Sequence, residues 1–335
     1  MAFDIFRHHL SLFLVNAEPR RVCKAWAIAL LVPTIYISPR KISTLDVNML
    51  HLERALNLGR VLIFRSSMYF DVVTTTLQDN KSIHRLDSSV IFINIEHIKA
   101  LVNTLAINTT ITYINLEGND MGADGKIKMF ATALQMNKGL TEIDLQANKI
   151  CTEGVVALAA ALYMNTTLTR LNLGCNHIDL EGVTAIAEML RKNTTLQRID
   201  LRVNEIGDAG AEAFALALTE NKTLTHIILN WNEIRDAGVI ALAVALRANT
   251  TLTYIDLGCN KKITDKGAKA FAVTLQSNKS LTHIDLSKTK ITDDGAKALT
   301  MAVQSNKILT HIDLYRTKIT DEVVKALAMA LQSNK

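Results

Sequence analysis

Apolar and polar residues follow two patterns of different spacing along this chain. The two patterns succeed each other and recur many times. The segment with Leu196, Ile199 and Leu201 ends in a strict alternation of apolar and polar residues, which predicts a short strand with one buried face. Further along, the apolar residues recur at helical spacing, as in Ala211, Phe214, Ala215 and Leu218. Each unit therefore predicts a short strand followed by a helix.

The strand-helix unit repeats with a period of 28 or 29 residues. Eight copies are clear from a leucine that closes each strand: Leu116, Leu145, Leu173, Leu201, Leu229, Leu257, Leu286 and Leu314. One such unit cannot bury its apolar face alone, whereas stacked units share one continuous core. The pattern predicts an α/β solenoid with parallel inner strands and outer helices.

An asparagine stands three positions after most of these leucines, where the chain leaves the strand: Asn119, Asn148, Asn176, Asn204, Asn232 and Asn260. An amide at this place can pair with backbone groups that the turn would leave without partners. Thr289 and Thr317 replace the asparagine in the last two units. Because a hydroxyl forms fewer hydrogen bonds, we expect looser turns there.

Before residue 108 the repeat becomes irregular, and we expect two degenerate units ahead of the eight regular ones. Their predicted strands and helices are Val61–Phe64, Phe70–Gln78, Ile83–Leu86 and Ile93–Ala106. Residues 1–57 are expected to be mainly helical, with breaks at the prolines, and to cap the array that spans 58–335.

The consensus LxxLxLxxNxI, as in Leu168–Ile178, resembles the leucine-rich-repeat superfamily. The 28-residue period with a full helix is similar to the ribonuclease-inhibitor subtype, which is also found in NOD-like receptors. This resemblance covers about residues 108–335 and implies a horseshoe. The near identity of neighbouring units also resembles arrays in effector proteins of intracellular bacteria.

A short element near the N-terminus offers a second interpretation of residues 1–57. Val22, Cys23 and Trp26, within the sequence RVCKAW, resemble the end of an F-box. That resemblance implies binding of a Skp-type adaptor of a ubiquitin ligase. The leading Leu-Pro and the central Asp-Leu of an F-box are absent, so a helical cap that buries Trp26 is the other interpretation.

Alternate strand residues point out of the concave face of a horseshoe, and we expect a partner protein to bind there. The first exposed column is Tyr113, Glu142, Arg170, Arg198, His226, Tyr254, His283 and His311. The third column adds Arg202, Asn230 and Tyr315, and the column beside it adds Trp231 and Arg316. The second column, mostly Asp and Asn, is nearly constant and is expected to belong to the scaffold. We place the binding hot spot around Trp231, because Trp, Tyr and Arg most often dominate interface energy.

Charge and composition exclude several other functions. Residues 1–60 carry eight Lys/Arg and four Asp/Glu, which leaves 29 against 28 in the other residues, so no nucleic-acid groove is expected. The four cysteines lack zinc spacing, and no cofactor motif is present, so we expect neither a metal nor a cofactor. The longest apolar run, Ala25–Ile37, is too short to span a membrane. The sequons, such as that at Asn165, recur at one place in the repeat and are explained without glycans.

These features predict a non-catalytic protein that binds another protein on its concave face. The pairing of His283 and His311 with Asp285 and Asp313 is explained by duplication of the unit, so no enzyme is expected. A secreted bacterial effector acting in the host cytosol, or a cytoplasmic inhibitor of another enzyme, fits this interpretation. The alternative is an F-box-type substrate adaptor of a ubiquitin ligase.

Overall fold

The computed structural model describes residues 34–37, 61–64, 67 and 70–332 of the chain. These fall into two compact units, residues 1–148 and 149–335, and each unit is treated by itself. The F-box-like element around Trp26 and the predicted boundary at residue 57 lie outside the described residues, so both stay predictions.

The first unit is a parallel sheet with helices between its strands. In chain order its elements are β1 (Thr34–Ile37), β2 (Val61–Phe64), α4 (Phe70–Leu77), β3 (Arg85–Asp87), α5 (Ile95–Ile107), β4 (Tyr113–Asn115), α6 (Lys126–Met136) and β5 (Glu142–Asp144). Each strand pairs in parallel with the next one in the chain. The strands and helices expected in the two degenerate units are therefore present.

One expectation in this unit was wrong. Residues 34–37 were assigned to a mainly helical segment, but they form strand β1, which pairs with β2. The sequence Thr-Ile-Tyr-Ile consists of β-branched and aromatic residues, which favour a strand. Pro33 and Pro39 stand on either side of it and oppose a helix through this segment.

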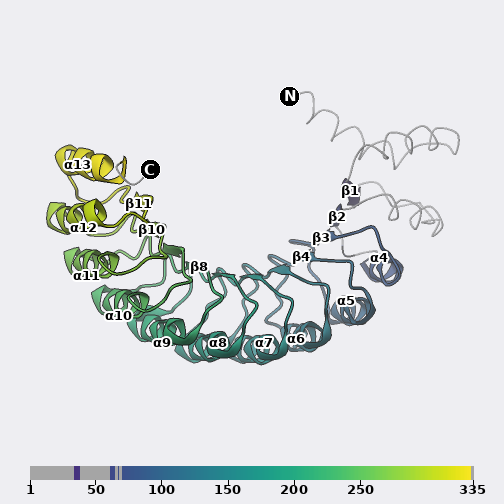
Figure 1. Cartoon of the computed structure of the whole chain (residues 1–335). Helices are drawn as coiled ribbons and strands as arrows, with labels where there is room; N and C mark the ends of the chain where they lie inside the picture. Colours follow the sequence, from purple (N-terminus) through teal and green to yellow (C-terminus); the bar gives the residue numbers. More distant parts are fainter. Residues whose placement is uncertain (1–33, 38–60, 65–66, 68–69, 333–335) are drawn as a thin grey trace, which may run out of the picture. The chain divides into compact units, whose positions relative to one another are not determined.

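The second unit continues the same alternation with greater regularity. Its elements are α7 (Thr152–Met164), β6 (Arg170–Asn172), α8 (Leu180–Lys192), β7 (Arg198–Asp200), α9 (Gly207–Glu220), β8 (His226–Ile228), α10 (Asp236–Leu246), β9 (Tyr254–Asp256), α11 (Asp265–Leu275), β10 (His283–Asp285), α12 (Asp293–Ser305), β11 (His311–Asp313) and α13 (Asp321–Gln332). Strands β6 to β11 pair in parallel in chain order. The helices lie on one side of the strands (Figure 1). The fold is a leucine-rich-repeat solenoid, as predicted.

The core lies between each sheet and its helices. The leucines that close the strands are buried, and so are the helix residues at 3.6-residue spacing, such as Ala211, Phe214 and Leu218. Although aromatic residues are scarce, the largest fully buried side chains are four helix phenylalanines, Phe70, Phe130, Phe214 and Phe271. In the degenerate unit Ser88 takes the place of the closing leucine, and its buried hydroxyl has no partner among the described residues.

A second asparagine follows the end of each helix, and it fixes where the chain returns to the sheet. In the second unit, Asn193 donates from Nδ2 to the carbonyls of Leu162 at 2.7 Å and Asn165 at 3.3 Å. Its Oδ1 accepts the N–H groups of Thr195 at 2.9 Å and Leu196 at 2.7 Å. The Nδ2 end of the amide therefore ties one repeat to the one before it, and the Oδ1 end fixes the turn within its own repeat. The same position is a buried asparagine throughout the described repeats: Asn80, Asn108, Asn137, Asn165, Asn193, Asn221, Asn249, Asn278 and Asn306.

Candidate protein-binding surface

The face of each sheet that lies away from the helices is called here the strand face. Parallel pairing in the second unit aligns His226 with Arg198 and Tyr254, and His283 with Tyr254 and His311. We call the aligned residues at the start of strands β6 to β11 the first row: Arg170, Arg198, His226, Tyr254, His283 and His311. In the first unit, Arg85, Tyr113 and Glu142 are aligned in the same way.

Planar side chains of the first row stack along the sheet. The rings of His226 and Tyr254 are 5.4 Å apart between centroids, with 18° between their planes. His283 and His311 stack more closely, at 4.1 Å and 7°. In the first unit, the Arg85 guanidinium lies 3.7 Å from the centre of the Tyr113 ring. Neighbouring strands thus hold these side chains together as continuous surfaces.

The second row, two residues further along each strand, belongs to the scaffold. Its Asp and Asn side chains accept the backbone N–H two residues on, as Asn172 does from Gly174 at 3.0 Å and Asp285 from Ser287 at 2.8 Å. These hydrogen bonds fix the turn that ends each strand. The near constancy of this row is therefore explained by its structural role.

Asp256 is the most unusual member of the second row. Burial raises its pKa to about 6, and Asp285 and Asp200 add to this, although the N–H of Gly258 opposes the rise. Its carboxyl group is thus close to the midpoint of its titration in neutral to mildly acidic solution.

Arg202 and Asp200 form an ion pair at the end of β7. The Arg202 Nε atom lies 2.9 Å from each oxygen of the Asp200 carboxylate, and its Nη2 also contacts that carboxylate. Asp200 is buried, whereas the arginine is about two-fifths exposed. Much of the guanidinium is therefore committed to its own strand end.

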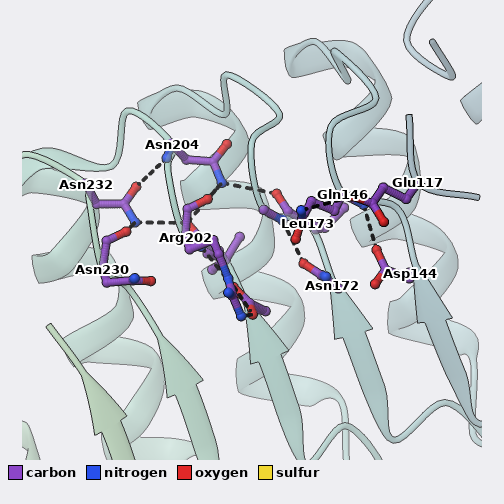
Figure 2. Close-up of polar contacts among 12 residues, drawn as sticks. Glu117, Asp144, Gln146, Asn172, Leu173, Arg202, Asn204, Asn230 and Asn232 are labelled. Carbon is purple, nitrogen blue, oxygen red and sulfur yellow. Dashed lines mark hydrogen bonds and ion pairs between the residues drawn. The ribbon is translucent and has the colours of Figure 1, made fainter. Parts of the chain in front are cut away.

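The asparagine at each turn forms the ladder expected from the sequence. Asn204 Nδ2 donates to the carbonyls of Leu173 at 3.1 Å and Leu201 at 2.9 Å. Its Oδ1 accepts the N–H groups of Asn176 and Ile178, each at 3.0 Å. Figure 2 shows Asn204 donating its own N–H to the Asn232 side chain in the next repeat.

The two threonines that replace this asparagine form fewer hydrogen bonds, as expected. Thr289 Oγ1 donates to the carbonyl of Leu286 at 2.7 Å, and Thr317 Oγ1 donates to that of Leu314 at 2.6 Å. Each hydroxyl thus bonds within its own turn, without the amide's reach into the preceding repeat.

Trp231 stands beside Asn230 on the turn after β8. Its side chain remains exposed, and the Lys261 Nζ atom lies 4.9 Å from the centre of its ring. Its backbone has φ +56°, in the left-handed region, as do Val203 and Cys259 at the same place in adjacent repeats. Such a backbone disfavours residues other than glycine. Asn230 Oδ1 is buried and has no hydrogen-bond partner among the described residues.

Six of the predicted site residues lie on three consecutive repeats of the second unit. Arg198, His226 and Tyr254 begin strands β7, β8 and β9, and Arg202, Asn230 and Trp231 follow the ends of β7 and β8. Arg170 lies on β6 of the same unit, while Tyr315 and Arg316 follow β11, where the guanidinium lies 5.2 Å from the phenol ring centre. Tyr113 and Glu142 belong to the first unit. The adaptor-binding candidates Val22, Cys23 and Trp26 lie outside the described residues.

Sequence reasoning missed an apolar row on the helices of the second unit. Five large side chains occupy one equivalent position and are between 50% and 70% exposed: Leu216, Val244, Val273, Met301 and Met329. Constant spacing of 28 or 29 residues between them was a signal that could have revealed the row. It is called here the helix row, and it is a second surface on which a partner could lie.

Within the described part of the chain, no three His, Cys, Asp or Glu side chains lie close enough together to hold a metal ion. None of the described helices combines the length and the apolar character that crossing a bilayer requires.

Comparisons with known proteins identify the repeat. Two solved structures are similar in part: leiomodin-1 actin-binding site 2, at 20% identity over 46% of this chain and 88% of that chain, with a TM-score of 0.41, and the leucine-rich-repeat-containing protein LegL7 from Legionella pneumophila, at 15% identity over 78% of this chain and 94% of that chain, with a TM-score of 0.48. No curated protein matches the chain. The family model for the MHP1/HER1/GIP3 LRR domain matches residues 43–317, which is more than half of the chain. The chain therefore belongs to the MHP1/HER1/GIP3 family of leucine-rich-repeat domains.

Proposed function

We propose that this chain is a non-catalytic binding protein that recognises another protein through its strand face. A leucine-rich-repeat fold generally serves protein–protein interaction, and here the varied residues stand on a constant frame. The single observation that carries the proposal is the exposed Trp231 in a left-handed turn. This turn follows β8, whose first residue, His226, is aligned with Arg198 and Tyr254 of the neighbouring strands. A bulky indole in this strained position has no role in the core, and Trp is the residue most enriched in interface hot spots.

Two biological settings fit such a protein. The ribonuclease-inhibitor-like length of the unit supports an inhibitor of another enzyme in the cytoplasm. The near identity of neighbouring units supports an effector that acts in the cytosol of a host. The alternative function is a ubiquitin-ligase substrate adaptor, which rests on Val22, Cys23 and Trp26.

Affinity capture with matched variants of the full chain tests the proposal. Wild type, Trp231→Ala and the helix-row variant Met301→Glu are immobilised, and bound proteins from candidate lysates are quantified by mass spectrometry. We expect Met301→Glu to retain the captured partner and Trp231→Ala to weaken its binding by about 2 kcal/mol, or roughly thirtyfold.

The opposite pattern would place binding on the helix row and refute the strand-face proposal. A Skp-type adaptor and cullin that are captured by wild type and lost in Trp26→Ala would favour the alternative function.

A further inference from the structure

We infer that three histidines of the first row are locked with their Nε2 atoms outward, and that this row binds an extended acidic segment of a partner with uptake of protons. The three residues are His226, His283 and His311. The inference rests on the proposed function, because it names the chemistry that the strand face would recognise.

Each of these histidines contacts the hydroxyl of the threonine before it. The Nδ1 atom lies 2.8 Å from the hydroxyl oxygen in all three pairs, which are Thr225–His226, Thr282–His283 and Thr310–His311. The same hydroxyl also lies near a backbone carbonyl of the preceding strand, at 3.0, 2.9 and 3.2 Å respectively. The repeat therefore reproduces one three-atom arrangement at three places.

This arrangement fixes the tautomer of the imidazole. A hydroxyl has one proton, and two oxygens at about 3 Å repel each other unless that proton lies between them. The threonine hydroxyl therefore donates its proton to the carbonyl oxygen, and its own oxygen can only accept a hydrogen bond from the histidine ring. Nδ1 must carry the ring proton, which leaves the lone pair of the neutral ring on Nε2.

The Nε2 atom is the place where each ring can gain a proton. No hydrogen bond to Nε2 of these three rings is formed within the described part of the chain. When the ring is protonated, Nδ1 keeps its bond to threonine and Nε2 becomes a second donor without any reorientation. The row then offers new N–H donors to a partner that carries acceptors.

The composition of the row favours an acidic partner. Arg170 and Arg198 continue the row beyond His226, and the row contains no carboxylate in the second unit. The nearest acids are in the second row, where Asp285 and Asp313 accept backbone N–H groups at 2.8 and 2.7 Å. Asp200 is paired with Arg202. The six strands span about 24 Å at about 4.8 Å per gap, the length of roughly seven extended residues.

The groups around His226 and His283 disfavour protonation of these two rings in the unbound protein. Burial lowers the pKa of His226, and Arg198, Arg170 and His283 lower it further. Burial also lowers the pKa of His283, with a contribution from the stacked His311. Tyr254 lies between His226 and His283. A carboxylate brought by a partner would oppose these effects, so binding draws protons onto the rings. For each proton taken up on binding, the affinity rises by up to about tenfold when the pH falls by one unit.

Nitrogen NMR of the full chain labelled with 15N-histidine tests the lock without any partner. At pH 8 we expect Nδ1 to be protonated and Nε2 unprotonated in all three residues. Thr282→Val should release His283 to the opposite tautomer, whereas Thr253→Val should leave all three unchanged. Thr253 is the matched control because it makes the same carbonyl contact, at 3.1 Å, but precedes Tyr254. A proton on Nε2 in the wild type would overturn the lock.

Binding of a defined probe tests the partner chemistry. The probe is a fluorescein-labelled 12-residue peptide of alternating glutamate and threonine, measured by anisotropy at pH 7.5 and 5.5 and constant ionic strength. We expect affinity to rise at least tenfold at the lower pH, and the gain to fall below threefold in a His226→Gln, His283→Gln, His311→Gln variant. The same peptide with glutamine in place of glutamate should not bind.

Three results would overturn the inference: no binding of the acidic peptide at either pH, an equal pH effect in the triple variant, or tighter binding of a 12-residue polyuridine. The inference can fail while the proposed function stands, if a captured partner depends on Trp231 but the peptide does not bind. The proposed function can fail while the inference stands, if the peptide binds with the expected pH dependence but the captured partner depends on Met301.

Discussion

The Arg202 guanidinium lies along the Asp200 carboxylate two residues earlier, with its Nε 2.9 Å from both carboxylate oxygens. This pair holds together a turn whose acid is almost fully buried. Arg198 also belongs to β7, but it stands in the exposed first row. Two arginines four residues apart therefore differ in their surroundings: Arg202 is paired within its own turn, whereas Arg198 is exposed.

We predict that Arg202→Ala destabilises the protein by roughly 1–3 kcal/mol, because it leaves the buried Asp200 carboxylate without its cation. The control Arg198→Ala should change the free energy of unfolding by less than about 0.5 kcal/mol. Urea denaturation followed by circular dichroism measures both. A loss in Arg198→Ala that equals the loss in Arg202→Ala would contradict the division of roles.

The asparagine ladder gives a second prediction on stability. Asn204→Ala removes two donors and two acceptors from a buried turn and should cost roughly 1–3 kcal/mol. Thr317→Ala removes a single hydrogen bond from a half-buried turn and should cost below about 1 kcal/mol. Denaturant melts of the two variants give the order, and an inverted order would refute it.

The sequence predicted much of this because its period is constant. Parallel pairing in register turns equal spacing along the chain into rows on the strand face, so the first row could be written down from residue numbers alone. The same logic explains why Asn204 and Trp231 were found at turns. The helix row could have been found in the same way, since Leu216 and Val244 are also one period apart.

Other features depend on distances between repeats that the pattern does not contain. The contact of the Thr282 hydroxyl with the Thr253 carbonyl needs the actual separation of two strands. The burial of Asp256 depends on the neighbours that enclose it, because Asp285 and Asp313 at the same position of the following repeats are more exposed. Strand β1 was missed because its four residues lie in the segment before the repeats, where no period indicates the place of a strand.

The sequon asparagines should be unable to carry glycans in the folded protein. All seven are at most 5% exposed: Asn80, Asn108, Asn165, Asn193, Asn221, Asn249 and Asn278. Glycosylation would replace an Nδ2 proton that Asn193, for example, donates to a backbone carbonyl. We predict that a form directed into a glycosylating secretory pathway is recovered as misfolded glycoprotein.

A variant in which the third residue of every sequon is replaced provides the control, because it keeps the asparagines and blocks glycosylation. Its substitutions are Ser82→Ala, Thr110→Val, Thr167→Val, Thr195→Val, Thr223→Val, Thr251→Val and Ser280→Ala. It should be secreted in folded form. Mass spectrometry and protease resistance distinguish the outcomes, and a folded wild type with glycans on these asparagines would disprove the prediction.

The last prediction concerns the pH dependence of stability at Asp256. Its pKa in the folded protein is about 6, above the ordinary value of 3.8, so the folded state keeps a proton that the unfolded chain loses. Its destabilising effect is therefore absent below about pH 4, grows as the pH rises toward 6, and is complete above that.

Asp256→Asn keeps an acceptor for the Gly258 N–H, as Asn172 does for Gly174, but carries no charge. We expect the variant to be more stable than wild type by roughly 1–3 kcal/mol at pH 7 and to lose this advantage at pH 3.5. Asp313→Asn is the control, because this exposed carboxylate accepts the Tyr315 N–H at 2.7 Å in the same way but is not buried. Urea melts of the three proteins across this pH range measure the difference, and an advantage of Asp256→Asn that is independent of pH would show that burial of the charge is not its cause.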